Sequence, residues 1–270
     1  MKPAVVVDVG NTRIKWGRVV GAAVRDSVSL PPDNPSSWKA QILRWKLDPS
    51  ASWILSGVQP QRRDALAKWL QEQSHSVTLL DNWRQLPIRV DLDQPQSVGI
   101  DRLFNAVAAN AYRGPQRPAL LIDAGSAVTV DHLNEKGAFT GGAILPGLRL
   151  MGQALHSYTA KLPLVAMPER FDQLPFAPGK STADAMQLGI FWSIVGAIVF
   201  VTVEMGQTCQ WKTFPQIFLT GGDAKLLEPE LSRQLADPES PHCSVLAGET
   251  IHLWPTMTLE GIRLAAEALP

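Results

Sequence analysis

Two short stretches of this chain, one at its start and one near its middle, follow the same pattern. Each runs from an apolar strand into an aspartate, any residue, a glycine and a small polar residue, and then into an alternating strand. The pattern aligns Asp8 and Gly10 of VVVDVGNTRIKWG with Asp123 and Gly125 of LLIDAGSAVTVDH. Two β-hairpins of this kind, opening two successive halves, indicate a duplicated domain.

The first hairpin has features that suit a phosphate. Asp8 ends an apolar run, where a carboxylate is costly unless it is paired or binds a cation. The turn offers backbone N–H groups, the Thr12 hydroxyl and the Lys15 ammonium. An ordinary hairpin explains the same residues, and short motifs match often by chance, so both interpretations stand at this point. With the second hairpin, two carboxylate turns would face a cleft between the halves, which suits a polyphosphate and its Mg²⁺.

The whole chain divides into two halves at RGPQRP, residues 113–118. We predict an N-terminal domain over residues 1–115 and a C-terminal domain over residues 116–270, with the last helix able to pack back on the first domain. Strands alternate with helical patterns in both halves. Glycine-rich strand–helix junctions at 137–151 and 217–227 suit a nucleotide or phosphate, although each is also explained as a tight turn.

The composition excludes several classes of protein. Lys+Arg and Asp+Glu are each 25, so the formal net charge of zero predicts no broad attraction to nucleic acid or to an anionic membrane. Cys209 and Cys243 lie far apart, which excludes a disulfide framework and a cysteine metal motif. No secretory signal is recognised at the start, so we expect a cytoplasmic protein.

Two segments invite other interpretations. The uncharged run 188–203 is short for a membrane span, and we expect a central buried helix or one at a subunit interface. PFAPGKST at 175–182, with Pro175 first, resembles a phosphate-binding loop. Leu174 stands where that motif needs its first glycine, so we reject it.

Six blocks in order carry a resemblance to a known family: DVGNTRIK at 8–15, GIDR at 99–102, DAGSAVTVD at 123–131, GGAILPGLRLM at 141–151, AKLP at 160–163 and STADAMQLG at 181–189. The chain resembles the type III pantothenate kinases, including their relatives known as Bvg accessory factors. These belong to the acetate kinase/Hsp70/actin superfamily. The resemblance implies an α/β fold of two duplicated ribonuclease H-like (actin-like ATPase) domains, with mixed sheets flanked by helices and a cleft between the domains.

The resemblance also implies an activity and a site. The chain would use ATP to phosphorylate pantothenate, the first step of coenzyme A biosynthesis, with Asp101 as the general base. Asp8 would also hold Mg²⁺, and Asp123 a monovalent cation, K⁺ or NH₄⁺. The implied contacts with ATP and its phosphates are Asp8, Val9, Gly10, Asn11, Thr12, Arg13, Ile14, Lys15 and Ser126. The implied contacts with pantothenate are Gly99, Ile100, Asp101, Arg102 and Thr182.

Alternatives remain for the role of Asp101 and for the function. Asp101 in isolation is better explained as the N-cap of a helix beside a surface arginine, whereas the other blocks favour catalysis. Leu92 stands where the family often has a tyrosine that contacts substrate, and Ser126 replaces a threonine. The resemblance implies a homodimer with the helix 184–204 near the interface. The rival functions are a transcriptional regulator on the same fold and a kinase of another small molecule.

Overall fold

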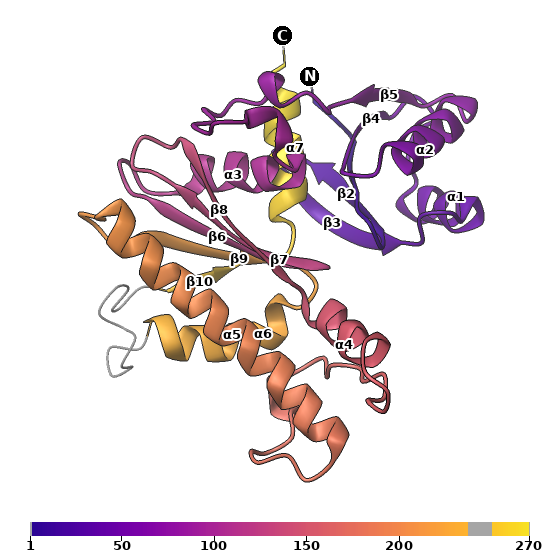
Figure 1. Cartoon of the computed structure of the whole chain (residues 1–270). Helices are drawn as coiled ribbons and strands as arrows, with labels where there is room; N and C mark the ends of the chain where they lie inside the picture. Colours follow the sequence, from indigo (N-terminus) through magenta and orange to yellow (C-terminus); the bar gives the residue numbers. More distant parts are fainter. Residues whose placement is uncertain (1, 237–249, 270) are drawn as a thin grey trace. The chain divides into compact units, whose positions relative to one another are not determined.

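The computed structural model describes residues 2–236 and 250–269, which form two compact units (Figure 1). One unit comprises residues 1–112 and 256–270, and the other comprises residues 113–255. Their boundary lies near the predicted one, but the last helix belongs to the first unit. The domain ranges 1–115 and 116–270 stay a proposal. Cys243 lies outside the described residues.

The first unit contains a five-stranded mixed sheet in the order β3-β2-β1-β4-β5. β1, β2 and β3 are antiparallel neighbours, whereas β4 and β5 run parallel to β1. The strands are β1 (Val5–Val9), β2 (Ile14–Val20), β3 (Ala23–Leu30), β4 (Ser52–Ser56) and β5 (Ser76–Leu79). The helices are α1 (Pro35–Trp45), α2 (Pro60–Glu72), α3 (Ile100–Tyr112) and α7 (Met257–Glu267).

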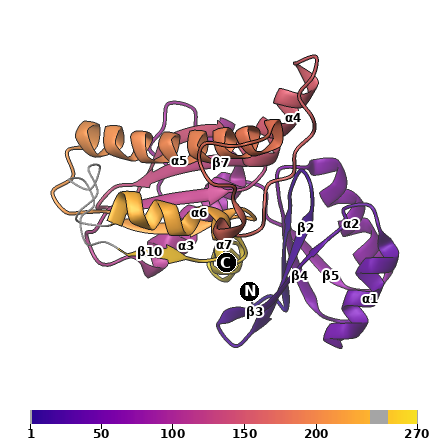
Figure 2. The same ribbon diagram turned by 90° about the horizontal axis from the view of Figure 1, so that it is seen from below.

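Helices cover both faces of this sheet (Figure 2). On one face, the buried Trp16 and Trp53 meet edge to face, with ring centroids 4.8 Å apart, beneath α1 and α2. On the other face lies α7, where Glu260 accepts a 2.7 Å hydrogen bond from the Val24 N–H. Since side chains alternate along a strand, Asp8 and Lys15 belong to the face that α7 packs against.

The second unit repeats this topology with the order β10-β9-β6-β7-β8. β6, β7 and β8 are antiparallel neighbours, β9 is parallel to β6, and β10 is parallel to β9. The strands are β6 (Ala119–Ala124), β7 (Ala127–Leu133), β8 (Phe139–Pro146), β9 (Gln216–Thr220) and β10 (Ile251–Leu253). The helices are α4 (Leu148–Ser157), α5 (Thr182–Cys209) and α6 (Ala224–Leu231). The repeated strand order confirms the predicted α/β fold of two duplicated ribonuclease H-like domains, whereas the cleft between them stays a prediction.

Helix α5 is longer than the uncharged run and is buried on one face only. Phe191 and Ile198 belong to the core beneath it, whereas Trp192 and Phe200 are 42% and 64% exposed. By length and composition α5 could cross a membrane, because a stretch of 18 residues in it has a mean hydropathy of 2.0. In the structure, 44% of that stretch is buried inside the protein. The sequence predicts either a central buried helix or one at a subunit interface. The structure shows burial on one face only, and the subunit interface stays a prediction.

A buried histidine ties the end of α5 to the sheet. The Trp211 indole N–H donates to His132 Nε2 at 3.0 Å, and His132 Nδ1 lies 2.7 Å from the Thr140 hydroxyl. Because Nε2 accepts this bond, the imidazole is neutral and carries its proton on Nδ1. Burial lowers the pKa of His132, and the charge of Glu135 opposes that shift. Burial also lowers the pKa of His75.

These lowered pKa values predict a loss of stability in acid. Above about pH 6.5 the histidines are neutral in both the folded and the unfolded chain. Between that pH and the lowered pKa of the folded chain, the unfolded chain binds protons that the folded chain does not. The free energy of unfolding therefore falls as the pH falls through this range. Urea midpoints between pH 7.5 and 5 should fall in the wild type and fall less in His132→Gln. If the urea midpoint falls with pH as steeply in both His132→Gln and His75→Gln as in the wild type, the lowered histidine pKa values do not cause the loss of stability.

Candidate active site

The first predicted phosphate turn lies between β1 and β2. The Gly10 N–H donates to the Arg13 carbonyl at 3.1 Å and closes the hairpin around Asn11 and Thr12, both exposed. Asp8 is half-buried one residue before the strand ends. A Cβ on Gly10 would lie only 3.2 Å from the Arg13 carbonyl oxygen, so a glycine suits the close approach there. Asn11 and Thr12 are exposed at the tip of the hairpin, so a phosphate can approach the turn from solvent.

Helix α2 holds this turn in place. Arg62 donates to the Asn11 carbonyl at 2.6 Å, and the Gln59 amide donates to the Asn11 side-chain oxygen. Arg62 also lies 3.7 Å from the Asp33 carboxylate. The Asn11 side chain therefore has a structural partner, which the sequence pattern did not reveal because Gln59 and Arg62 come from a separate element.

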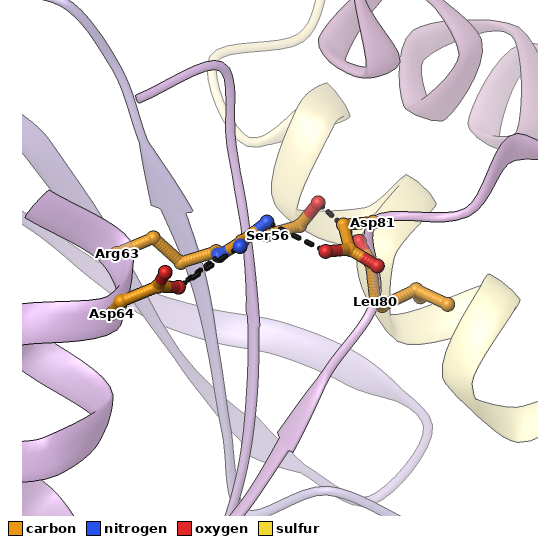
Figure 3. A network of polar contacts seen from close by, with 5 residues as sticks. All are labelled: Ser56, Arg63, Asp64, Leu80 and Asp81. Carbon is orange, nitrogen blue, oxygen red and sulfur yellow. Dashed lines mark hydrogen bonds and ion pairs between the residues drawn. The ribbon is translucent and has the colours of Figure 1, made fainter. Parts of the chain in front are cut away.

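A second polar network stands beside Asp8 at the ends of β4 and β5 (Figure 3). The buried Ser56, which is in register with Asp8, donates to the Leu80 carbonyl at 2.5 Å. Arg63 of α2 lies between two carboxylates and pairs with Asp64 and Asp81 at 2.9 Å each. This network fixes the carboxyl ends of both strands, and sequence reasoning missed it.

The predicted base lies at the start of α3. The Asp101 carboxylate accepts the Arg102 N–H at 2.8 Å, and that N–H also lies 3.1 Å from the Gly99 carbonyl. A Cβ on Gly99 would come within 2.6 Å of Asp101 Oδ1, so the glycine makes room for the folded-back carboxylate. Both Asp101 and Arg102 are half-buried. A carboxylate in the first helical turn is stabilised as an anion by the helix dipole.

The second turn, between β6 and β7, is shorter than the first. The Gly125 N–H donates to the Ala127 carbonyl at 3.0 Å. The Gly147 N–H donates to the Ser126 carbonyl at 3.2 Å and brings the start of α4 against the turn. A Cβ on Gly147 would lie 2.4 Å from the Gly125 carbonyl oxygen, so no other residue fits there without a shift of the backbone.

The glycine pair after β9 approaches the same turn. Gly221 has a φ of +103°, and a Cβ there would lie 2.3 Å from the Ala124 carbonyl oxygen. The Asp223 N–H donates to that carbonyl at 2.9 Å. Burial raises the pKa of the Asp223 carboxyl, and the nearby Arg149 cation opposes that shift. Asp223 and Arg149 were not among the predicted site residues, although both belong to glycine-rich junctions that the sequence marks.

The Gly-Lys-Ser-Thr run forms a helix cap. The Ser181 hydroxyl accepts the Asp184 N–H at 3.1 Å, and Asp184 accepts the Ser181 N–H at 3.2 Å. Thr182 is then the exposed first residue of α5. In the part of the chain that the structure describes, no strand leads directly into this run, which agrees with the rejection of a phosphate-binding loop.

The structure places the predicted residues in two sets. Residues 8–15 and 99–102 belong to the first unit, whereas Asp123, Ser126 and Thr182 belong to the second. Over residues 2–236 and 250–269, no group of three or more His, Cys, Asp or Glu side chains could hold a metal. A cation at Asp8 or Asp123 would therefore take its other ligands from substrate, water, hydroxyl or backbone oxygens.

Comparison with known proteins gives one family. A family model described as type III pantothenate kinase matches residues 4–203. A type III pantothenate kinase of Persephonella marina is 30% identical over 239 residues, which cover 82% of this chain and 88% of the relative. One of Synechococcus sp. is 33% identical over 240 residues, which cover 87% and 82%.

Solved structures agree on the fold. The crystal structure of the ethanolamine utilization protein EutJ from Carboxydothermus hydrogenoformans has a TM-score of 0.51 to this chain at 14% identity. The match covers 97% of this chain and 89% of that one. At this identity the likeness concerns the fold alone.

Proposed function

This chain belongs to the type III pantothenate kinase family, and on that premise we propose how its residues carry out the reaction. The enzyme transfers a phosphoryl group from ATP to pantothenate and makes 4′-phosphopantothenate for coenzyme A biosynthesis. The observation that carries this function is the family match over residues 4–203, which includes the Asp8 turn, the Gly99–Arg102 run and the Asp123 turn.

We assign proton removal to Asp101. The primary hydroxyl oxygen of pantothenate forms a bond to the γ-phosphorus while the bond from that phosphorus to the ADP oxygen breaks. A carboxylate within hydrogen-bond reach orients the hydroxyl and accepts its proton as the bond forms. The start of α3 suits this role, since the hydrogen bond from the Arg102 N–H holds the Asp101 carboxylate in a fixed position. The Arg102 cation would bind the anionic substrate, beside Gly99 and Ile100.

We assign the ATP phosphates to the turn from Asp8 to Lys15. Backbone N–H groups of the turn and the Lys15 ammonium offer donors to phosphate oxygens. Mg²⁺ binds one or two carboxylates together with substrate phosphates, so a single half-buried carboxylate at Asp8 fits its needs. When bound, the ion supplies positive charge to the transferring phosphoryl group. Arg62, by holding Asn11, keeps the turn in its conformation.

We assign supporting roles to the second unit. Ser126 would contact ATP through its hydroxyl, and Thr182 would contact pantothenate from the exposed start of α5. Asp123 would hold a monovalent cation, K⁺ or NH₄⁺. Leu92 cannot donate the hydrogen bond of the tyrosine it replaces, so Leu92→Tyr should lower the KM for pantothenate.

We also propose that the chain is a homodimer that pairs through α5, in the cytoplasm. Trp192 and Phe200 lie exposed on α5, and a Cβ on Gly189 or Gly196 would have no atom within 4 Å, so this face is open to a second helix. Exposed apolar surface of this kind is typical of an interface.

Phe200→Lys should therefore convert a dimer to a monomer, because a lysine would be desolvated in the interface. Light scattering on the eluting protein measures the mass directly. Leu43→Lys, at an exposed leucine of α1 that is 68% exposed, should leave the dimer intact and serves as the control. A dimeric Phe200→Lys protein would contradict the role of α5.

An assay of ADP release tests the function against its rivals. With ATP, Mg²⁺ and K⁺, release should depend on pantothenate and not on other small alcohols such as glycerol. Release with a different acceptor alone would indicate another small-molecule kinase. DNA binding in a gel-shift assay without pantothenate-dependent ADP release would favour the regulator.

A further inference from the structure

Asp8 and Asp123 occupy equivalent positions in the two sheets, and each stands in a row of three side chains. In the first unit, β-strand register places Asp8 between Lys15 on β2 and Ser56 on β4. In-register neighbours point to the same face of a sheet. The Lys15 ammonium therefore stands on the same face as the Asp8 carboxylate, and the Ser56 hydroxyl is already bonded to the Leu80 carbonyl.

The corresponding row in the second unit has no cation. Register places Asp123 between Thr129 on β7 and Thr220 on β9. The hydroxyls of both threonines are buried and have no hydrogen-bond partner in the described structure. A buried hydroxyl without a partner has lost its hydrogen bonds to water without replacement, so two of them beside one carboxylate indicate a missing ligand.

We propose that Thr129 and Thr220 complete a monovalent-cation site with Asp123. The inference rests on the proposed assignment of a monovalent cation to Asp123. Hydroxyl oxygens accept both coordination by K⁺ and hydrogen bonds from NH₄⁺.

The charge of the donors favours a monovalent ion. Asp123 contributes one carboxylate, and its neighbours in the row, Thr129 and Thr220, are neutral. Sites built for Ca²⁺ or for transition metals collect several carboxylates, imidazoles or thiolates, and no such group exists among residues 2–236 and 250–269. One negative charge with hydroxyl oxygens balances one positive charge.

Thermal melting at constant ionic strength tests this site without any turnover. Replacing tetramethylammonium chloride by KCl should raise the melting temperature of the wild type by about 2–4 °C, because K⁺ binds only the folded chain. Thr129→Val and Thr220→Val keep the side-chain shape and remove the hydroxyl, so each should lose most of this K⁺-specific rise. Thr129→Ser, which keeps the hydroxyl, should retain it.

Thr202→Val is the matched control. Thr202 on α5 also has a buried hydroxyl without a partner in the described structure, but it is not in the Asp123 row. That variant should keep the full rise. Thr129→Lys should melt at the same temperature in both salts, because it brings its own ammonium to Asp123.

The inference is overturned if the wild type shows no K⁺-specific rise, or if both valine variants keep it. Pantothenate-dependent ADP release, measured in saturating K⁺, separates this outcome from failure of the proposed function. An active kinase whose K⁺ response survives in Thr129→Val and Thr220→Val would refute the threonine site alone. Absence of kinase activity with an intact pattern of K⁺ responses would refute the function and leave the cation site standing.

Discussion

Asp101→Asn should lower turnover of pantothenate by about 10²–10⁴-fold, the range usual for loss of a positioned general base. The amide keeps the size of the carboxylate but cannot accept the hydroxyl proton. Its oxygen can still accept the Arg102 N–H, which the carboxylate accepts at 2.8 Å, so the start of α3 should be retained. Steady-state kinetics should therefore show a loss in kcat with little change in the KM for ATP.

Asp26→Asn gives the matched control for this variant. Asp26 lies on β3 of the same unit, its side chain is 56% exposed, and its ion pair with Arg18 is long, at 3.9 Å. Removing this surface charge should change neither kcat nor stability measurably. If Asp101→Asn turns over pantothenate at a rate near that of Asp26→Asn, then Asp101 is not the base, and its carboxylate serves only to accept the Arg102 N–H in the first turn of α3.

Gly261→Ala should destabilise the first unit by about 3 kcal/mol or more. Gly261 lies where α7 crosses α3, and a Cβ there would be 1.9 Å from the Phe104 carbonyl oxygen. Since the obstacle is backbone, the two helices would have to separate. The neighbouring bond from the Thr258 hydroxyl to Asn105, 2.8 Å long, would be disturbed as well. Thermal unfolding should show a melting temperature roughly 5–10 °C lower.

Gly114→Ala provides the comparison for Gly261→Ala. A Cβ on Gly114 meets only the flexible Arg117 side chain, at 3.7 Å, so its cost should stay within about 0.5 kcal/mol. Equal melting temperatures for the two variants would mean that α7 does not pack against α3 as closely as the structure indicates.

Much of the fold follows from local sequence. The repeated run of strand, aspartate, glycine and strand predicts both hairpins, and the structure places Asp8 and Asp123 at equivalent positions on β1 and β6. Local signals suffice here because a hairpin pairs residues that are close in the chain. The Gly99–Asp101 spacing likewise has a local physical reason, since the carboxylate folds back over the glycine.

Other features depend on residues that meet only after folding. Thr220 stands beside Asp123 because β9 pairs with β6 across a long crossover, and no local sequence pattern predicts that register. The same holds for Arg63 and Asp81, which join α2 to the end of β5, and for α7, which returns to the first unit from the end of the chain. The short β10 was missed because three residues, Ile251–Leu253, are too few to show a period.

Direct identification of the reaction product tests the central claim most simply. The purified chain is incubated with ATP, Mg²⁺, K⁺ and pantothenate, and the organic products are identified by mass spectrometry. We predict 4′-phosphopantothenate and ADP in equal amounts from the wild type, and at least about 100-fold less of both from Asp101→Asn in the same time. ADP without 4′-phosphopantothenate, or unchanged pantothenate in the presence of a folded wild-type chain, would contradict the assignment.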